Sequence, residues 1–115
     1  MSKIDLKDYA YSNTATTRCL DNSIPEKYRL NAEKTVERFN AIQSLIGRCR
    51  LTSGYRSHVL NELVGGVVGS KHLQALACDF VPEECSLDTA LLALQHLPCV
   101  IYAYIGSNYI HVSFK

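Results

Sequence analysis

Apolar residues recur every three or four positions between residues 32 and 46, and this spacing predicts an amphipathic helix. The residues on its apolar face are Ala32, Thr35, Val36, Phe39, Ile42 and Ile46. We expect the helix to begin near Ser23-Ile24-Pro25-Glu26, with Ser23 as the cap, and to end at Gly47. A second, shorter helix is predicted from Ser86-Leu87-Asp88 to Leu97, because Pro98 stops it.

Alternating and β-branched residues predict four strands, at residues 48–53, 76–81, 100–104 and 109–114. The last two flank Gly106-Ser107-Asn108, a pattern typical of a hairpin. A short helix is predicted at residues 57–64, before a loop with three glycines. We therefore expect an α+β fold: a small, mostly antiparallel sheet with a long N-terminal helix and a second shorter helix. Residues 1–24 are predicted to be an extended lead-in that wraps the outside of the domain.

Length and composition indicate one ordinary globular domain spanning residues 1–115, with 47% hydrophobic and 20% charged residues. The net charge of +1 comes from scattered residues, which argues against a nucleic-acid surface. Five cysteines without a C-x-x-C pair suggest buried thiols in a reducing cytoplasm rather than a disulfide framework. The charged N-terminus and the lack of a long apolar run predict no signal peptide and no membrane span, hence cytoplasmic synthesis.

Strand alternation turns two polar side chains away from the core. In the last strand, His111 points opposite to Ile110 and Val112, and in the second strand Asp79 points opposite to its apolar neighbours. His72 precedes Asp79 by seven residues, on the loop that enters the strand. Two imidazoles and one carboxylate are a zinc donor set that leaves a position for water. The spacing alone is more typical of a surface histidine beside a surface aspartate.

Several motifs occur in order along most of the chain: Thr52-Ser53-Gly54-Tyr55-Arg56-Ser57, Leu60-Asn61, Val64-Gly65-Gly66, Ser70-Lys71-His72, Ala77-Cys78-Asp79 and Ile110-His111-Val112-Ser113. Together they resemble the zinc D-Ala-D-Ala carboxypeptidase family, which contains peptidoglycan peptidases and phage endolysins and shares its zinc fold with the hedgehog signalling domain. The resemblance implies that His72, Asp79 and His111 bind Zn²⁺. It also implies that Arg56 stabilises the scissile carbonyl or binds a peptide carboxylate, and that Ser70 orients the ligand loop or contacts substrate.

Two positions depart from the family pattern. Ala75 replaces a glycine, which we expect to require only an ordinary backbone angle. The family's acid/base carboxylate, shortly before the last histidine, is missing, because residues 104–108 read Tyr-Ile-Gly-Ser-Asn. Tyr102, Tyr104 and Tyr109 are candidates to position water or to donate to the leaving group. Of these we assign the catalytic role to Tyr104 and contact with the substrate to Tyr109. By their charge, Glu83 and Glu84 are better candidates for a base than a tyrosine, but they lie outside the family position. The simpler interpretation is that both are solvated charges on a loop.

The resemblance implies a zinc metallopeptidase that hydrolyses bonds of peptidoglycan stem peptides or cross-links, as a D,D- or L,D-type carboxypeptidase or endopeptidase. The lack of an export signal suits a phage-encoded lysis or entry protein that other means deliver to the cell wall. The missing carboxylate favours an alternative: a pseudopeptidase whose structural zinc supports binding of a cell-wall peptide or a partner protein.

Overall fold

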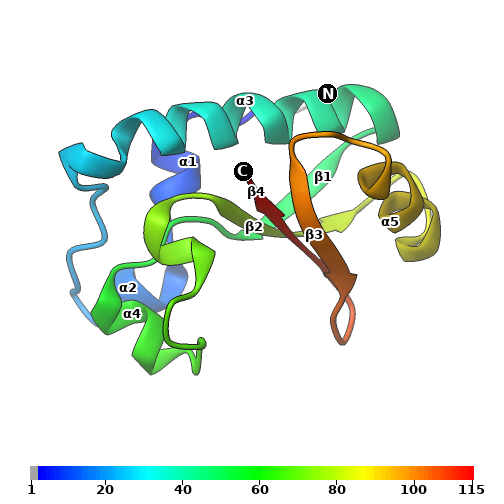
Figure 1. Cartoon of the computed structure of the whole chain (residues 1–115). Helices are drawn as coiled ribbons and strands as arrows, with labels where there is room; N and C mark the ends of the chain where they lie inside the picture. The colour runs from blue at the N-terminus through cyan, green and yellow to red at the C-terminus, as the bar shows by residue number, and fades with distance from the viewer. Residues whose placement is uncertain (1–2) are drawn as a thin grey trace.

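The computed structural model describes residues 3–115, which form an α+β domain built on one antiparallel sheet (Figure 1). The four strands lie in the order β1-β2-β4-β3 and all three pairings are antiparallel. Their bounds are β1 Cys49–Ser53, β2 Ala77–Pro82, β3 Val100–Ile105 and β4 Ile110–Phe114. The predicted fold class, strands and terminal hairpin are confirmed. Among residues 3–115, no helix combines the length and apolar character needed to cross a membrane.

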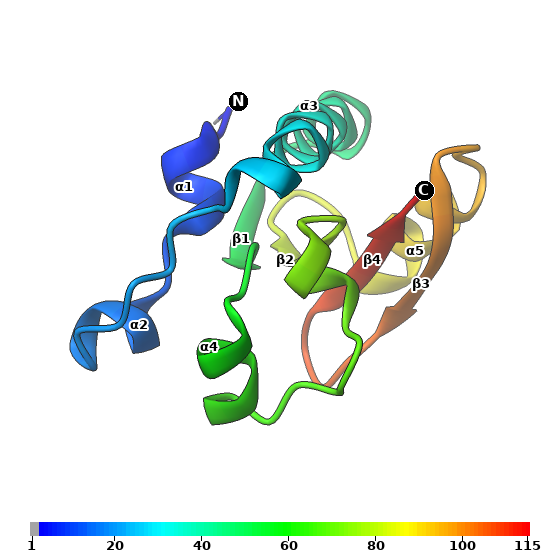
Figure 2. The same cartoon turned by 60° about the vertical axis from the view of Figure 1, so that its left-hand side comes forward.

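Two helices pack on one face of this sheet. The long helix α3 (Arg29–Ile46), seen nearly end-on in Figure 2, contacts β2, while α5 (Leu87–Gln95) packs mainly against β3 and also contacts α3. Phe39 of α3 meets Phe80 of β2 edge to face, with ring centroids 5.7 Å apart. This contact fixes which face of β2 is core, so the residues that alternate with Phe80 point to the opposite face.

The start of α3 differs from the prediction. Pro25 precedes a 3-10 turn, η1 (Glu26–Tyr28), which leads into the helix. Ser23 does not cap it, because its hydroxyl donates to the Asp21 carboxylate at 2.6 Å. The Ser23 hydroxyl therefore bonds to the charged carboxylate two residues before it and not to the backbone at the start of the helix. Gly47 ends α3 at a φ of +92°, as its position suggested.

The predicted extended lead-in is wrong for much of its length, and its first two residues lie outside the described part. It contains two short helices, α1 (Leu6–Ala10) and α2 (Asn13–Thr17), so the long helix is not the first element. Asp5 and Ser12 cap them, and Tyr9 is fully buried with its hydroxyl donating to the Ala77 carbonyl at 2.7 Å. Helices of about one turn are too short to show an apolar period, and tertiary contacts stabilise them.

The face opposite the helices collects the candidate site residues through strand register. Asp79 of β2 pairs with His111 of β4, which in turn pairs with Tyr104 of β3. Ser53 at the end of β1 is the partner of Asp79 on its other side. Between β1 and β2 the chain forms α4 (His58–Leu63) and the 3-10 turn η2 (Lys71–Gln74), which carries His72. Paired residues share a face, so four strands contribute to one site.

Candidate metal centre

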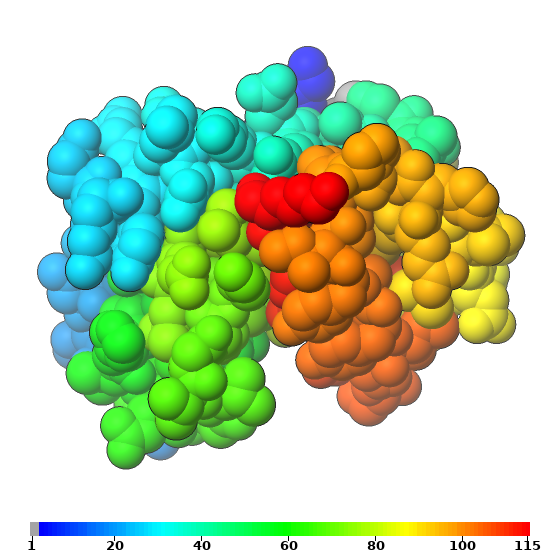
Figure 3. Space-filling model, viewed as in Figure 1, coloured from blue at the N-terminus to red at the C-terminus, as the bar shows by residue number. Residues whose placement is uncertain are grey.

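Two buried imidazoles converge on one oxygen of a buried carboxylate. The Oδ1 atom of Asp79 lies 2.8 Å from His111 Nδ1 and 3.2 Å from His72 Nε2. One potential ligand atom from each residue falls within 4.8 Å of the others, a group that could hold a metal ion. The surface is hollowed between the segment around α4 and the β3–β4 hairpin, the two regions that flank this group (Figure 3).

The far nitrogens of the two imidazoles show how a cation would fit. His72 Nδ1 donates to the carbonyl of Gly54 at 2.7 Å, and His111 Nε2 lies 2.8 Å from the hydroxyl of Ser113. A neutral imidazole has only one N–H, and a carbonyl can only accept. Therefore Nε2 of a neutral His72 directs its lone pair at the Asp79 carboxylate. A cation among the three ligand atoms removes this repulsion, and a nitrogen-oxygen donor set of this kind suits zinc.

The surroundings of Asp79 keep its carboxylate ionised. Burial alone would raise the pKa of Asp79, but the hydrogen bond from His111, together with the close contact with His72, outweighs burial and holds the pKa well below its ordinary value. Asp79 therefore presents a full negative charge at neutral pH, which is the form that binds a metal.

Arg56 is fixed beside the same carboxylate. Its Nη2 lies 3.4 Å from Asp79 Oδ2, while Nε donates to Ser53 at 3.0 Å and Nη1 to the Asn61 side chain at 3.2 Å. Gly66 packs against this arrangement, since a Cβ there would collide with Asn61 and approach Arg56 Nη1 to 2.9 Å. A guanidinium held at three corners can present a permanent charge in a defined direction.

The backbone at Ala75 corrects the expectation of an ordinary angle. Ala75 adopts the left-handed conformation, with φ of +60° and ψ of +36°. This closes η2, because the N–H of Leu76 then bonds to the carbonyl of Lys71 at 3.0 Å. A non-glycine residue pays about 1–2 kcal/mol for this conformation. The turn that positions His72 is therefore strained where the family has glycine.

Ser70 caps the turn that carries His72. Its hydroxyl is largely buried and accepts the backbone N–H of His72 at 3.2 Å. This bond starts the η2 turn. The structure thus gives Ser70 an orienting contact with the turn that carries His72.

Two half-exposed tyrosines of β3 lie against His111. The ring of Tyr104 stacks on the imidazole with centroids 4.9 Å apart, and Tyr102 stacks at 5.5 Å. Burial, followed by repulsion from Tyr109 and Asp79, raises the pKa of Tyr104. Tyr104 is therefore protonated at neutral pH and can donate a hydrogen bond, but it is not a base.

Glu83 and Glu84 both contact Arg48 and none of the candidate site residues. The carboxylate of Glu83 forms an ion pair with Arg48 Nε at 3.1 Å, and that of Glu84 accepts the Arg48 backbone N–H at 2.6 Å. These contacts lie past the end of β2 and agree with the interpretation of loop charges.

The sequence motifs include Asn61, Gly54 and Ser113, but no role in the site was predicted for them. Ser113 had a signal, because it lies two residues after His111 and so shares its strand face. Asn61 lies five residues after Arg56, and Gly54 lies 18 residues before His72. Neither spacing predicts a hydrogen bond.

Two imidazoles and a carboxylate, beside a fixed guanidinium on one face of a small sheet, define a site of the zinc-hydrolase type. The family model of peptidase M15 matches residues 3–113, so the chain belongs to the peptidase M15 family, the zinc-dependent D-Ala-D-Ala carboxypeptidase type. This confirms the resemblance found in the sequence motifs. Comparison with curated proteins found no significant match to the chain.

Proposed function

We propose that this protein is a zinc peptidase that hydrolyses peptide bonds of bacterial peptidoglycan, in stem peptides or their cross-links. The observation that carries the proposal is the convergence of His72, Asp79 and His111 with Arg56 held 3.4 Å from the same carboxylate. Membership of the peptidase M15 family supports it. The proposal includes action as a D,D- or L,D-type carboxypeptidase or endopeptidase. It also includes a phage origin, with the protein delivered to the cell wall by other means.

The roles of the side chains follow from their contacts. His72, Asp79 and His111 hold the zinc ion, which when bound supplies a Lewis acid for the substrate carbonyl and lowers the pKa of water. Arg56 binds the oxygen of the scissile carbonyl or a neighbouring peptide carboxylate, because its guanidinium is fixed and always charged. Ser70 holds the turn that carries His72.

Tyr104 acts as a hydrogen-bond donor to the leaving amine. Its raised pKa keeps the phenol protonated, and its ring lies against a metal-binding histidine. Tyr109, which directly precedes β4, contacts the substrate in this proposal. A well-placed proton donor typically contributes about 10²- to 10⁴-fold to the rate.

The test is release of free amino groups from purified peptidoglycan by the zinc-loaded protein. We expect release by the wild type, none by His72→Ala, and wild-type release by His96→Ala. The second variant makes the same change at an exposed histidine that bonds to the Leu92 carbonyl. If wild type and His72→Ala give equal release, or if neither releases anything from several wall types, the proposal is wrong.

One observation favours a second candidate, a pseudopeptidase that uses a structural zinc to bind a cell-wall peptide or a protein partner. Residues 104–108 carry no carboxylate, and Glu83 and Glu84 contact Arg48. Loss of a general base costs about 10²- to 10⁴-fold in rate. This candidate predicts bound zinc and bound peptide with no release of amino groups in the same assay.

A further inference from the structure

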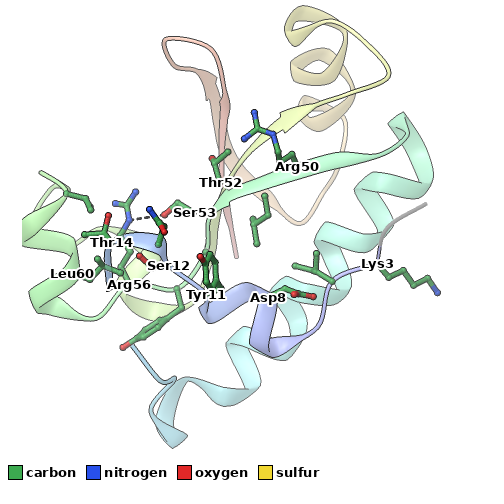
Figure 4. Close-up of a pocket in the computed structure, with 16 residues that line it drawn as sticks. Lys3, Asp8, Tyr11, Ser12, Thr14, Arg50, Thr52, Ser53, Arg56 and Leu60 are labelled. Carbon is green, nitrogen blue, oxygen red and sulfur yellow. Dashed lines mark hydrogen bonds between the residues drawn. The ribbon is translucent and has the colours of Figure 1, made fainter. Parts of the chain in front are cut away.

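A cavity of about 730 Å³ lies beside β1, apart from the three metal-binding candidates. One wall is β1 and the residues after it, and the other is the N-terminal segment with α1 and the start of α2 (Figure 4). Arg56 lies near one end and Lys3 at the other. Sites for small ligands occupy roughly 300–1,000 Å³, so the cavity is large enough for part of a substrate.

The strand along this cavity is suited to pairing with an extended peptide. β1 is at the edge of the sheet, and in the described part of the chain β2 is its only strand neighbour. An edge strand offers backbone N–H and C=O groups to an added strand. At about 3.3 Å per residue, the five residues of β1 span roughly 16 Å, the length of a short extended peptide.

The charges in the cavity favour an anionic occupant. Three cations line it, Lys3, Arg50 and Arg56, against the single carboxylate of Asp8. Arg50 is exposed on β1, and it forms no ion pair with a carboxylate among residues 3–115. The remaining polar lining consists largely of hydroxyl and amide groups, including Ser12, Asn13, Thr14 and Thr52. A peptide with a free carboxylate matches this lining.

Two residues connect the cavity with the candidate metal centre. Ser53 and Arg56 both line it, and both also adjoin Asp79, Ser53 by strand pairing and Arg56 through its ion pair. A peptide arm that follows β1 therefore ends at the guanidinium beside the metal-binding carboxylate.

We propose that this cavity is a distal subsite which binds an extended, carboxylate-bearing arm of the peptide substrate along the edge of β1, with Arg50 contacting the carboxylate. The nature of the peptide rests on the proposed function, whereas binding along β1 does not require turnover. A longer substrate gains affinity from this subsite, and a peptide too short to reach it does not.

The test is an NMR titration of the metal-free, full-length protein with a synthetic stem pentapeptide, so that binding is measured without hydrolysis. We expect the largest amide shifts in residues 50–53. Arg50→Glu should weaken binding of the pentapeptide about tenfold. Amidation of the carboxylate on the arm assigned to Arg50 should weaken binding to the wild type by a similar factor. Arg29→Glu, a matched charge reversal at an exposed position on α3, should bind like the wild type.

Shifts confined to other elements, or equal affinity for wild type and Arg50→Glu, would overturn the subsite. The outcome is separate from that of the peptidase proposal. Binding along β1 without release of amino groups from peptidoglycan would retain the subsite and reject hydrolysis. Hydrolysis of peptidoglycan together with an unchanged peptide affinity in Arg50→Glu would retain the peptidase proposal and reject the subsite.

Discussion

Ser113→Ala tests whether the hydroxyl behind His111 supports metal binding. Ser113 is fully buried, and its Oγ lies 2.8 Å from His111 Nε2. In the metal-free arrangement Nδ1–H donates to the Asp79 carboxylate, so the hydroxyl donates to Nε2. With a cation at Nδ1, the imidazole proton moves to Nε2 and the hydroxyl accepts it. A serine can serve both states because it is donor and acceptor.

The magnitude follows from the difference between these two hydrogen bonds. Alanine loses a neutral bond worth about 0.5–1.5 kcal/mol in the metal-free protein, and a charge-assisted bond worth about 1.5–3 kcal/mol in the zinc-bound one. The middle values of these ranges differ by about 1.2 kcal/mol, which corresponds to roughly tenfold weaker zinc binding. Supporting partners of metal-binding histidines typically contribute about 10- to 100-fold, so this estimate lies at the lower end.

The assay is a competition titration of zinc between the protein and a chromophoric chelator. Ser86→Ala is the matched control, because Ser86 caps α5 and its loss lowers stability by about 1 kcal/mol. The control should lose stability and keep its zinc affinity. If Ser113→Ala binds zinc as tightly as the wild type, or if both variants weaken it equally, the reasoning is refuted.

Two further substitutions separate chemistry from folding. Tyr104→Phe should lower kcat by about 10²-fold or more with little change in KM, whereas Tyr102→Phe, the same change on the same strand, should not; equal kcat values would exclude Tyr104 as a donor. Tyr9→Phe should lower the free energy of unfolding by about 1–3 kcal/mol, since it leaves the buried Ala77 carbonyl without its 2.7 Å bond. Urea denaturation measures this loss, and an unchanged midpoint would show that α1 does not support β2.

The sheet and the face of the candidate site could be predicted because both depend on local alternation. A strand turns successive side chains to opposite faces, so placing Ile110 and Val112 in the core is enough to direct His111 outward. The same argument directs Asp79 of β2 to that face. The antiparallel register of β2 and β4 then places Asp79 opposite His111.

The remaining features depend on contacts that the alternation of side chains along a strand does not predict. The buried hydroxyl of Tyr9 bonds to a carbonyl 68 positions later, which no window of sequence can show. The left-handed conformation of Ala75 is imposed by the turn that returns His72 toward Asp79, not by the residue itself. Asn61 lies only five residues after Arg56, but its bond to the guanidinium depends on the turn that joins β1 to α4.

The central claim is that His72, Asp79 and His111 bind one zinc ion, and anomalous diffraction at the zinc edge tests it most directly. Crystals of zinc-loaded protein should show a single strong peak among His72 Nε2, the Asp79 carboxylate and His111 Nδ1, about 2.0–2.2 Å from each. Crystals of His111→Ala should lose it. No peak at this position in the wild type, or a peak at the cysteines instead, would contradict the account.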